Sequence, residues 1–260
     1  MKIEPFMWLM ISCSLMIIAF ILLPLLEMVV QPTAAEMVET LHDPDVVRSI
    51  MFSVLTSSAA ALISFVLGTP FAYLLARGTF PGKKIIESVV DLPIMIPHPV
   101  VGIALLSIAG QNHWIGQALQ KMGMTFMGTA TGIITVMTFV GIPFYINTVK
   151  TGFEAIPVRI ENVARSLGAS RSGAFFRVTF PLAWRSMVVG MIMCMARGIS
   201  EFGAIVIVAY HPMVASVLIY ERFTAYGIKY SQPVAVWLII ICLFLFLMLR
   251  LFSIQKKSAT

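Results

Sequence analysis

Six long apolar runs constrain the fold of this chain more than any other feature. Each is close to the roughly 20 residues that a helix needs to cross a bilayer. The runs are Trp8–Val30, Ile50–Ala76, Val89–Ala109, Ala130–Val149, Met187–Ala209 and Pro233–Phe252. They lack the ten-residue alternation that is typical of membrane strands. The sequence therefore predicts an all-α integral membrane protein with six transmembrane helices.

The composition agrees with a membrane protein and excludes most soluble classes. Hydrophobic residues make up 59% of the chain and charged residues 12%, against about 25% charged residues in an ordinary soluble domain. A cytosolic enzyme and a disordered protein are both excluded by this balance. The first run is predicted to be a retained helix, because it exceeds the apolar core of a signal peptide and no A-x-A site follows it. A cleaved signal peptide is the alternative.

The distribution of basic residues predicts the orientation. With a cytoplasmic N-terminus, thirteen of the eighteen Lys and Arg residues lie inside, and Arg197 lies within a span. The four on the outer side are Arg48, Lys121, Arg222 and Lys229. This positive-inside bias predicts a multi-pass protein of the cell membrane with both termini in the cytoplasm. The net charge of +6 then requires no nucleic-acid partner.

The loop 150–186 is too long for a simple connection, and such ordered loops usually have a function. A short amphipathic helix is predicted in it, because Ile160, Val163, Ala164 and Leu167 fall on one face. Glu161 lies in its first turn, where a negative charge is favoured. Gly168 is expected to end the first helix of the loop in a left-handed conformation, and Ser170 or Ser172 to cap the second. Pro181 is expected to break the chain before the fifth span. The alternative is a helix that lies on the membrane surface.

Charged residues inside a span indicate function by default, because they are costly in a bilayer. Arg197 and Glu201 are spaced i, i+4 and can pair on one helix face, with Ser200 between them. Gly198 and Gly203 permit close helix approach. Two interpretations stay open: a polar strip that faces a pathway or gate, or an internal ion pair that fixes helix packing.

The start of the third run cannot form a regular helix, because Pro93, Pro97 and Pro99 follow Asp91 closely. A broken backbone at membrane depth is tolerated where it is buried in protein or lines a water-filled cavity. His98 lies in this break and is either a pathway residue or a satisfied polar group. The four histidines share no ligand spacing, so no metal site is predicted.

The loop resembles the permease subunits of ABC importers, which carry E-A-A-x3-G-x9-I-x-L-P before the second-to-last span. The matching residues are Asn162-Val163-Ala164, Gly168 and Val178-x-Phe180-Pro181, with Asn162 in place of the glutamate and Val163 in place of the first alanine. In that family the helix docks on an ATPase subunit. The resemblance implies ATPase coupling through Glu161, Asn162, Val163, Ala164, Gly168 and Pro181. It implies a permease domain at 49–255 with coupling loop 150–186, preceded by a helix and external loop at 1–48 and followed by a tail at 256–260.

Two further motifs, A-R-x-x-x-E-F-G-A at 196–204 and L-P-x-x-I-P-H at 92–98, resemble permeases for sulfate, molybdate and tungstate. The outer segments 210–213 and 218–222 resemble the molybdate/tungstate branch, including its archaeal members. The resemblance implies a homodimer of permeases in membrane lipid, a homodimer of ABC ATPases that hold ATP-Mg, and an external oxyanion-binding protein. The candidate pathway or gate residues, from the proline break and the polar residues of the fifth span, are Asp91, Pro93, Pro97, His98, Arg197, Ser200, Glu201 and Gly203. The outer loops 31–48 and 210–232 are expected to face the binding protein, with Tyr220, Glu221 and Arg222 as candidate docking residues.

Two other functions are weighed against an importer permease. The chain is predicted not to be an ATPase, since the stretch Gly78–Lys84 is one residue short of a P-loop and lacks its final Ser/Thr; no cofactor is expected in the chain itself. An ion-coupled secondary anion transporter would rely on Glu201 or Asp91 and leave the long loop unexplained. An intramembrane hydrolase built on Ser200 and His98 would lack the G-x-S-x-G elbow, so no catalytic residue is assigned.

Overall fold

The computed structural model describes residues 5–110, 112–121, 123 and 125–253, and within these ranges it contains helices and no strand. The helices are α1 (Pro5–Val30), α2 (Ala34–His42), α3 (Pro44–Arg77), α4 (Lys83–Met95), α5 (His98–Ala109), α6 (Trp114–Lys121), α7 (Ala130–Glu154), α8 (Val158–Ser166), α9 (Arg171–Ala174), α10 (Phe180–Ile199), α11 (Ile205–Val208), α12 (Ala215–Tyr226) and α13 (Ile228–Ser253). The predicted all-α class is confirmed. The tail 256–260 lies outside the described residues.

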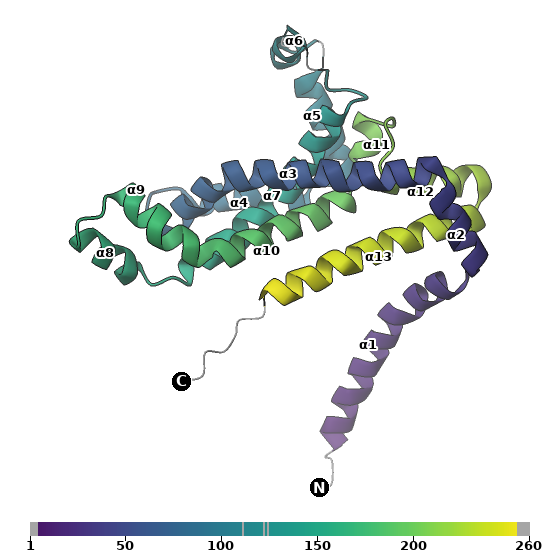
Figure 1. Cartoon of the computed structure of the whole chain (residues 1–260), viewed down its shortest axis with the longest axis horizontal. Helices are drawn as coiled ribbons and strands as arrows, with labels where there is room; N and C mark the ends of the chain where they lie inside the picture. Colours follow the sequence, from purple (N-terminus) through teal and green to yellow (C-terminus); the bar gives the residue numbers. More distant parts are fainter. Residues whose placement is uncertain (1–4, 111, 122, 124, 254–260) are drawn as a thin grey trace.

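Helices α3, α7 and α10 pack side by side and form the centre of the molecule (Figure 1). Small residues permit their close approach. A Cβ atom on Gly68 of α3 would lie 2.7 Å from the ring of Tyr145 in α7, and one on Gly141 would lie 2.5 Å from Sγ of Cys194 in α10. Small residues at such contacts are the usual means of packing helices in a membrane, where apolar burial gives little driving force between them.

The two ends of this central bundle carry different elements. Helices α8 and α9 lie at one end, and α2 and α12 lie at the opposite end (Figure 1). Helix α3 connects the two ends. The bundle therefore presents two separate surfaces outside its apolar middle.

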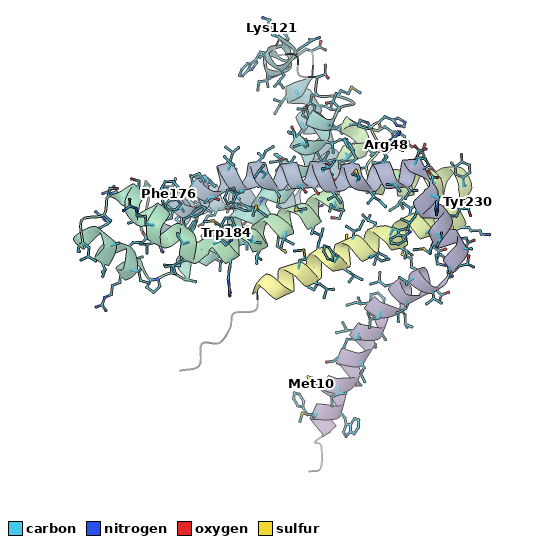
Figure 2. All side chains as sticks on the ribbon, viewed as in Figure 1. Met10, Arg48, Lys121, Phe176, Trp184 and Tyr230 are labelled. Atoms are coloured by element: carbon cyan, nitrogen blue, oxygen red, sulfur yellow. The ribbon has the colours of Figure 1, made fainter. Side chains whose placement is uncertain are left out.

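Helix α1 leaves the bundle. It approaches α13 near its C-terminal end, where Gln232 Nε2 donates to Gln31 Oε1 at 2.6 Å. Elsewhere its apolar side chains, such as that of Met10, project into open space (Figure 2). This helix therefore presents the apolar surface that contact with lipid or another subunit requires.

Five helical segments are long and apolar enough to cross a membrane, and α4 with α5 makes up to a sixth. The axes of α4 and α5 meet at 111°, with the break at Ile96 and Pro97. The predicted interruption of the third run is thus confirmed, and the helix before the break begins at Lys83 rather than at the predicted Val89. The missing proline N–H groups and the fixed φ of Pro97 explain the break.

The boundaries of the fifth span were predicted wrongly. Pro181 does not break the chain, because one helix continues from Arg171 to Ile199. The preceding turn, Phe175–Thr179, is π-helical, and the amide of Phe180 donates to the carbonyl of Phe175. This wider turn accommodates the proline ring where a regular α-helix would clash with it.

The same span also ends earlier than predicted. Helix α10 stops at Ile199, and residues 200–204 form a turn before α11. The expectation that the apolar run continued as helix to Ala209 is therefore wrong. Hydropathy alone does not separate a helix from a buried turn, and both lie in the run.

The segment predicted as an external loop contains a helix that was not predicted. Helix α2 begins with a capping box: the amide of Glu36 donates to Oγ1 of Thr33, and the amide of Thr33 donates to Oε2 of Glu36. This T-x-x-E pattern is a known helix-start signal. The segment 31–48 is therefore ordered rather than an open loop.

Candidate functional site

The break between α4 and α5 meets the C-terminal end of α10 at a cluster of three polar side chains. Nη2 of Arg197 lies 2.9 Å from Oε2 of Glu201 and 2.9 Å from Nδ1 of His98. Nδ1 of His98 lies 2.5 Å from Oε2 of Glu201. The predicted pairing of Arg197 with Glu201 is confirmed, although Glu201 follows the end of the helix.

Exposure separates the roles of these three side chains. The side chain of Glu201 is completely buried, whereas that of Arg197 is 19% exposed and that of His98 is 43% exposed. A buried carboxylate needs several donors to offset the loss of hydration. Glu201 has them, because its Oε1 also accepts from the amide of Ala204 at 2.9 Å. Glu201 therefore holds the cluster together, and Arg197 and His98 present its accessible surface.

The turn after α10 packs directly on the start of α5. A Cβ atom on Gly203 would lie 2.9 Å from Cβ of His98, and one on Gly102 would lie 2.8 Å from the carbonyl oxygen of Ala204. Oγ of Ser216 in α12 donates to the carbonyl of Glu201 at 2.7 Å. The absence of side chains at the two glycines thus lets the turn after α10 pack closely on the first turns of α5.

Gly203→Ala should lower stability by about 1–3 kcal/mol, because an added methyl group in a filled contact forces the backbone apart. The melting temperature of the detergent-solubilised protein measures the change. Gly198→Ala is the matched control, since its Cβ would be 3.3 Å from Cβ of Met137 and should cost less. Equal melting temperatures for the two variants would contradict this packing.

The remaining residues predicted for this site make contacts of their own. Oδ1 of Asp91 accepts from Nδ2 of Asn147 at 2.7 Å, which joins α4 to α7. Pro93 is buried within α4. Ser200 is exposed, and its Oγ donates to the carbonyl oxygen of Arg197 at 3.0 Å. Asp91 therefore belongs to a contact of its own and not to the three-residue cluster.

The predicted loop helix is present as α8. The side chains of Val158, Ile160, Val163 and Leu167 are exposed, as is that of Asn162, while Ala164 is partly buried. A short helix with unpartnered apolar side chains at the end of the bundle presents the surface of a docking element.

Glu161 lies on the opposite, buried side of α8. Its carboxylate accepts from the hydroxyl of Tyr73 at 2.9 Å and lies 2.7 Å from Nη2 of Arg77. Nη2 of Arg77 also donates to the carbonyl of Ile156 at 2.9 Å. These contacts tie α8 to the end of α3. The structure thus places Glu161 as an anchor of the helix, away from the exposed face that carries Asn162 and Val163.

The predicted end of α8 and the start of the next helix are confirmed. Gly168 has φ of +94°, the left-handed region that glycine enters without penalty. The amide of Gly173 donates to Oγ of Ser170 at 3.0 Å, so Ser170 is the cap. Gly168 thus fixes the turn between α8 and the helix that carries Pro181 on its exposed side.

Arg222, Glu221 and Tyr220 lie on α12, at the other end of the bundle. Nη2 of Arg222 donates to Oδ2 of Asp43 at 2.6 Å. Partial burial opposes ionisation of Asp43, but hydrogen bonds from the Asp45 amide and Arg222 outweigh it and lower the pKa of the Asp43 carboxyl. The Tyr220 ring lies 4.8 Å from that of Phe202. This contact connects α12 to the turn that holds Glu201.

Several partners of the predicted residues were missed in the sequence. They are Tyr73, Arg77, Asn147, Asp43 and Ser216. Arg77 stands at the end of a predicted span. In the sequence it was only one of the thirteen basic residues that predicted the orientation. Arg77 and Glu161 are 84 positions apart in the chain. A single sequence does not indicate that two such distant residues are in contact.

The sequence matches the family described as binding-protein-dependent transport system inner membrane component over residues 68–258. It is 42% identical to the molybdate/tungstate transport system permease protein WtpB of Thermococcus kodakarensis over the full length of both chains. Identity to the protein of that name from Methanocaldococcus jannaschii is 39%, over 92% of this chain and 93% of the relative. The sulfate transport system permease protein CysT of Synechocystis is more distant, at 30% identity over 80% and 74% of the two chains.

Solved structures show the same fold at low sequence identity. A chain of a bacterial alginate ABC transporter has a TM-score of 0.73 at 17% identity, covering 97% of this chain and 96% of that one. A chain of the MetNI methionine ABC transporter has a TM-score of 0.64 at 16% identity, with coverage of 80% and 96%. The fold is therefore that of an ABC transporter permease. This chain belongs to the family of binding-protein-dependent transport system inner membrane components, and it is a multi-pass transport subunit.

Proposed function

We propose that this chain is the permease of an ATP-driven importer for molybdate or tungstate. Sequence identity of 39–44% to four permeases of that name carries the proposal. The intramembrane guanidinium of Arg197 is chemically suitable for a dianion, since guanidinium groups bind oxyanions well. Few other donors lie near Arg197. The permease would therefore bind the anion weakly and let it pass, and selectivity would rest with an external binding protein.

The proposed topology has six spans and both termini in the cytoplasm. The bent pair α4 and α5 then counts as the third span. The positive-inside bias of the sequence supports this orientation. It places α8 and α9 on the cytoplasmic side, and α2 and α12 on the outer side.

The proposed assembly contains two copies of this permease, two ATPase subunits with ATP-Mg, and an extracytoplasmic oxyanion-binding protein. The exposed apolar face of α8, with Asn162, Val163 and Ala164, is the proposed ATPase contact. Tyr220, Glu221 and Arg222 lie at the other end, where the binding protein would dock. The free surface of α1 suits lipid and the neighbouring subunit.

The proposed gate is the contact between the α4–α5 break and the turn after α10. Pro93 and Pro97 set the bend, while Gly203 lets the turn reach His98. Arg197, Ser200 and His98 face the pathway, and Glu201 holds them in place. Asp91 lies beside this route on α4. Alternating access then requires this contact to open and close.

The function is tested with the complete transporter in proteoliposomes and a binding protein loaded with tungstate, molybdate or sulfate. We expect one loaded binding protein to stimulate ATP hydrolysis and anion uptake together. Uptake that follows an ion gradient without ATP would instead support a secondary transporter.

Gly168→Trp should abolish the stimulation while the permease still inserts in the membrane. A non-glycine residue at φ of +94° costs roughly 1–2 kcal/mol, and the indole ring would block the end of α8. ATPase activity with and without loaded binding protein measures the effect. Arg171→Trp, three residues further along on an exposed position, is the control for bulk alone and should retain stimulation.

A further inference from the structure

A groove of about 870 Å³ lies at the α8 end of the bundle, away from the three-residue cluster. Its walls are the C-terminal part of α7, the segment that leads into α8, and the first half of α10. Polar lining residues alternate with apolar ones; the polar set is Asn147, Thr148, Thr151, Arg185 and Ser186. The groove is large enough for a tetrahedral oxyanion with part of its hydration shell.

Arg185 gives the groove a positive charge that its lining does not compensate. The guanidinium is exposed, and among the described residues it forms no ion pair. The residues that line the groove include no Asp or Glu. The nearby cation Lys150 differs, because its Nζ lies 2.5 Å from Oε1 of Glu87. Among the described residues that line the groove, Arg185 is therefore the one cation, and no lining carboxylate pairs with it.

The donors available beside Arg185 can be identified from their contacts. Thr148 and Thr151 direct their hydroxyls to carbonyl oxygens of their own helix. Asn147 uses one amide hydrogen for Asp91 and has a second. Ser186 lines the groove next to Arg185, and its hydroxyl lies beside Gly152 of α7, another lining residue. A guanidinium with a neighbouring hydroxyl and amide is a donor set for oxyanions.

The groove lies along the side of α10 that leads to the cluster. At 100° per residue, Arg185, Val189, Ala196 and Ser200 fall within about 60° on the helix surface. Oγ of Ser200 in turn lies 3.5 Å from Nη1 of Arg197. The separation of Arg185 from Ser200 along the axis is about 22 Å. Ser200 thus shares a side of the helix with Arg185, while Arg197 lies about 120° around the axis and reaches that side through its contact with Ser200.

We propose that this groove is an anion-release site, in which Arg185 holds the tetrahedral dianion between the gate and the cytoplasm. The proposal rests on the proposed function, which fixes both the anion and the side of the membrane. Arg185 supplies a local attraction that draws the dianion away from Arg197. A lipid phosphate headgroup has the same oxygen chemistry, so the test must separate a free anion from a lipid.

The experiment measures equilibrium binding of labelled tungstate to the purified transporter complex, without nucleotide or binding protein, in phosphatidylcholine discs. Arg185→Gln removes the charge, and Arg185→Lys keeps it. Arg177→Gln is the matched control, because Arg177 is exposed in the same helical segment but does not line the groove. We expect Arg185→Gln to weaken binding by about tenfold, a change of roughly 1.4 kcal/mol, and Arg177→Gln to leave it unchanged.

Three results would overturn the inference. They are unchanged binding in Arg185→Gln, equal loss in Arg177→Gln, and complete displacement of tungstate when the discs contain phosphatidylglycerol, which would make the groove a headgroup site. The ATPase subunits alone are measured in parallel, so that only the part of the binding that depends on Arg185 is counted. ATP-driven tungstate uptake by the unmodified complex tests the proposed function separately. If the unmodified complex takes up tungstate with ATP but Arg185→Gln binds tungstate as well as the unmodified complex does, the release site is rejected and the proposed function stands.

Discussion

Glu201→Ala should destabilise the permease by about 3–5 kcal/mol, the range for removing one partner of a buried ion pair. The substitution leaves Arg197 with His98 as a neighbour and removes the acceptor for the Ala204 amide. We expect a lower melting temperature in detergent and a loss of tungstate uptake in proteoliposomes. Glu201→Gln should be milder, because its amide oxygen can still accept one of these hydrogen bonds.

A double substitution separates a structural ion pair from a pathway cation. Arg197→Met with Glu201→Leu removes both charges and leaves apolar side chains of similar size, which often restores stability. If Arg197 contacts the anion, the double variant should regain most of the melting temperature yet transport no tungstate. Recovery of both properties would show that the pair serves packing only.

Arg77→Met should uncouple ATP hydrolysis from transport. The carboxylate of Glu161 would keep the hydroxyl of Tyr73 but lose its buried cation, again at about 3–5 kcal/mol, and the carbonyl of Ile156 would lose its donor. Because α8 then loses its ion pair with α3 and keeps the weaker hydrogen bond from Tyr73, we expect movement of the ATPase not to reach the spans. The measurement is ATPase activity: we expect basal hydrolysis to persist without stimulation by loaded binding protein.

Two controls accompany the Arg77 variant. Lys84→Gln removes one positive charge from an exposed position at the same end of the molecule and should change neither activity. Arg77→Lys keeps the charge near Glu161 but cannot reproduce the forked guanidinium contact with Glu161 and Ile156, so partial coupling is expected. Full stimulation in Arg77→Met would reject the anchoring role of Glu161.

The apolar runs and the proline pattern predicted most of the helical framework. The length of a run reports a span well, because a helix at membrane depth must satisfy its own backbone. The break near His98 followed from the local geometry of proline. Gly168 and Ser170 were also predictable, since helix termination and capping depend on a few adjacent residues.

The remaining features depend on contacts between distant segments. Pro181 remains within a helix because the preceding turn widens, and that register shift is set by packing. The buried position of Glu161 depends on Arg77 of another helix. The end of α10 depends on the Glu201 side chain and on α5. In each case, contacts with a distant segment decide the conformation or the burial of a residue, and the neighbouring sequence alone favoured a different outcome.

The length of α3 has a mechanical consequence. At 1.5 Å per residue its 34 residues extend about 51 Å, well beyond the roughly 30 Å of a hydrocarbon core. Asp43 at one tip is clamped to Arg222, and Arg77 at the other is clamped to Glu161. Ion pairs to other helices thus hold both ends of α3. We therefore expect a displacement of α3 at one face of the membrane to be transmitted along this single helix to the other face.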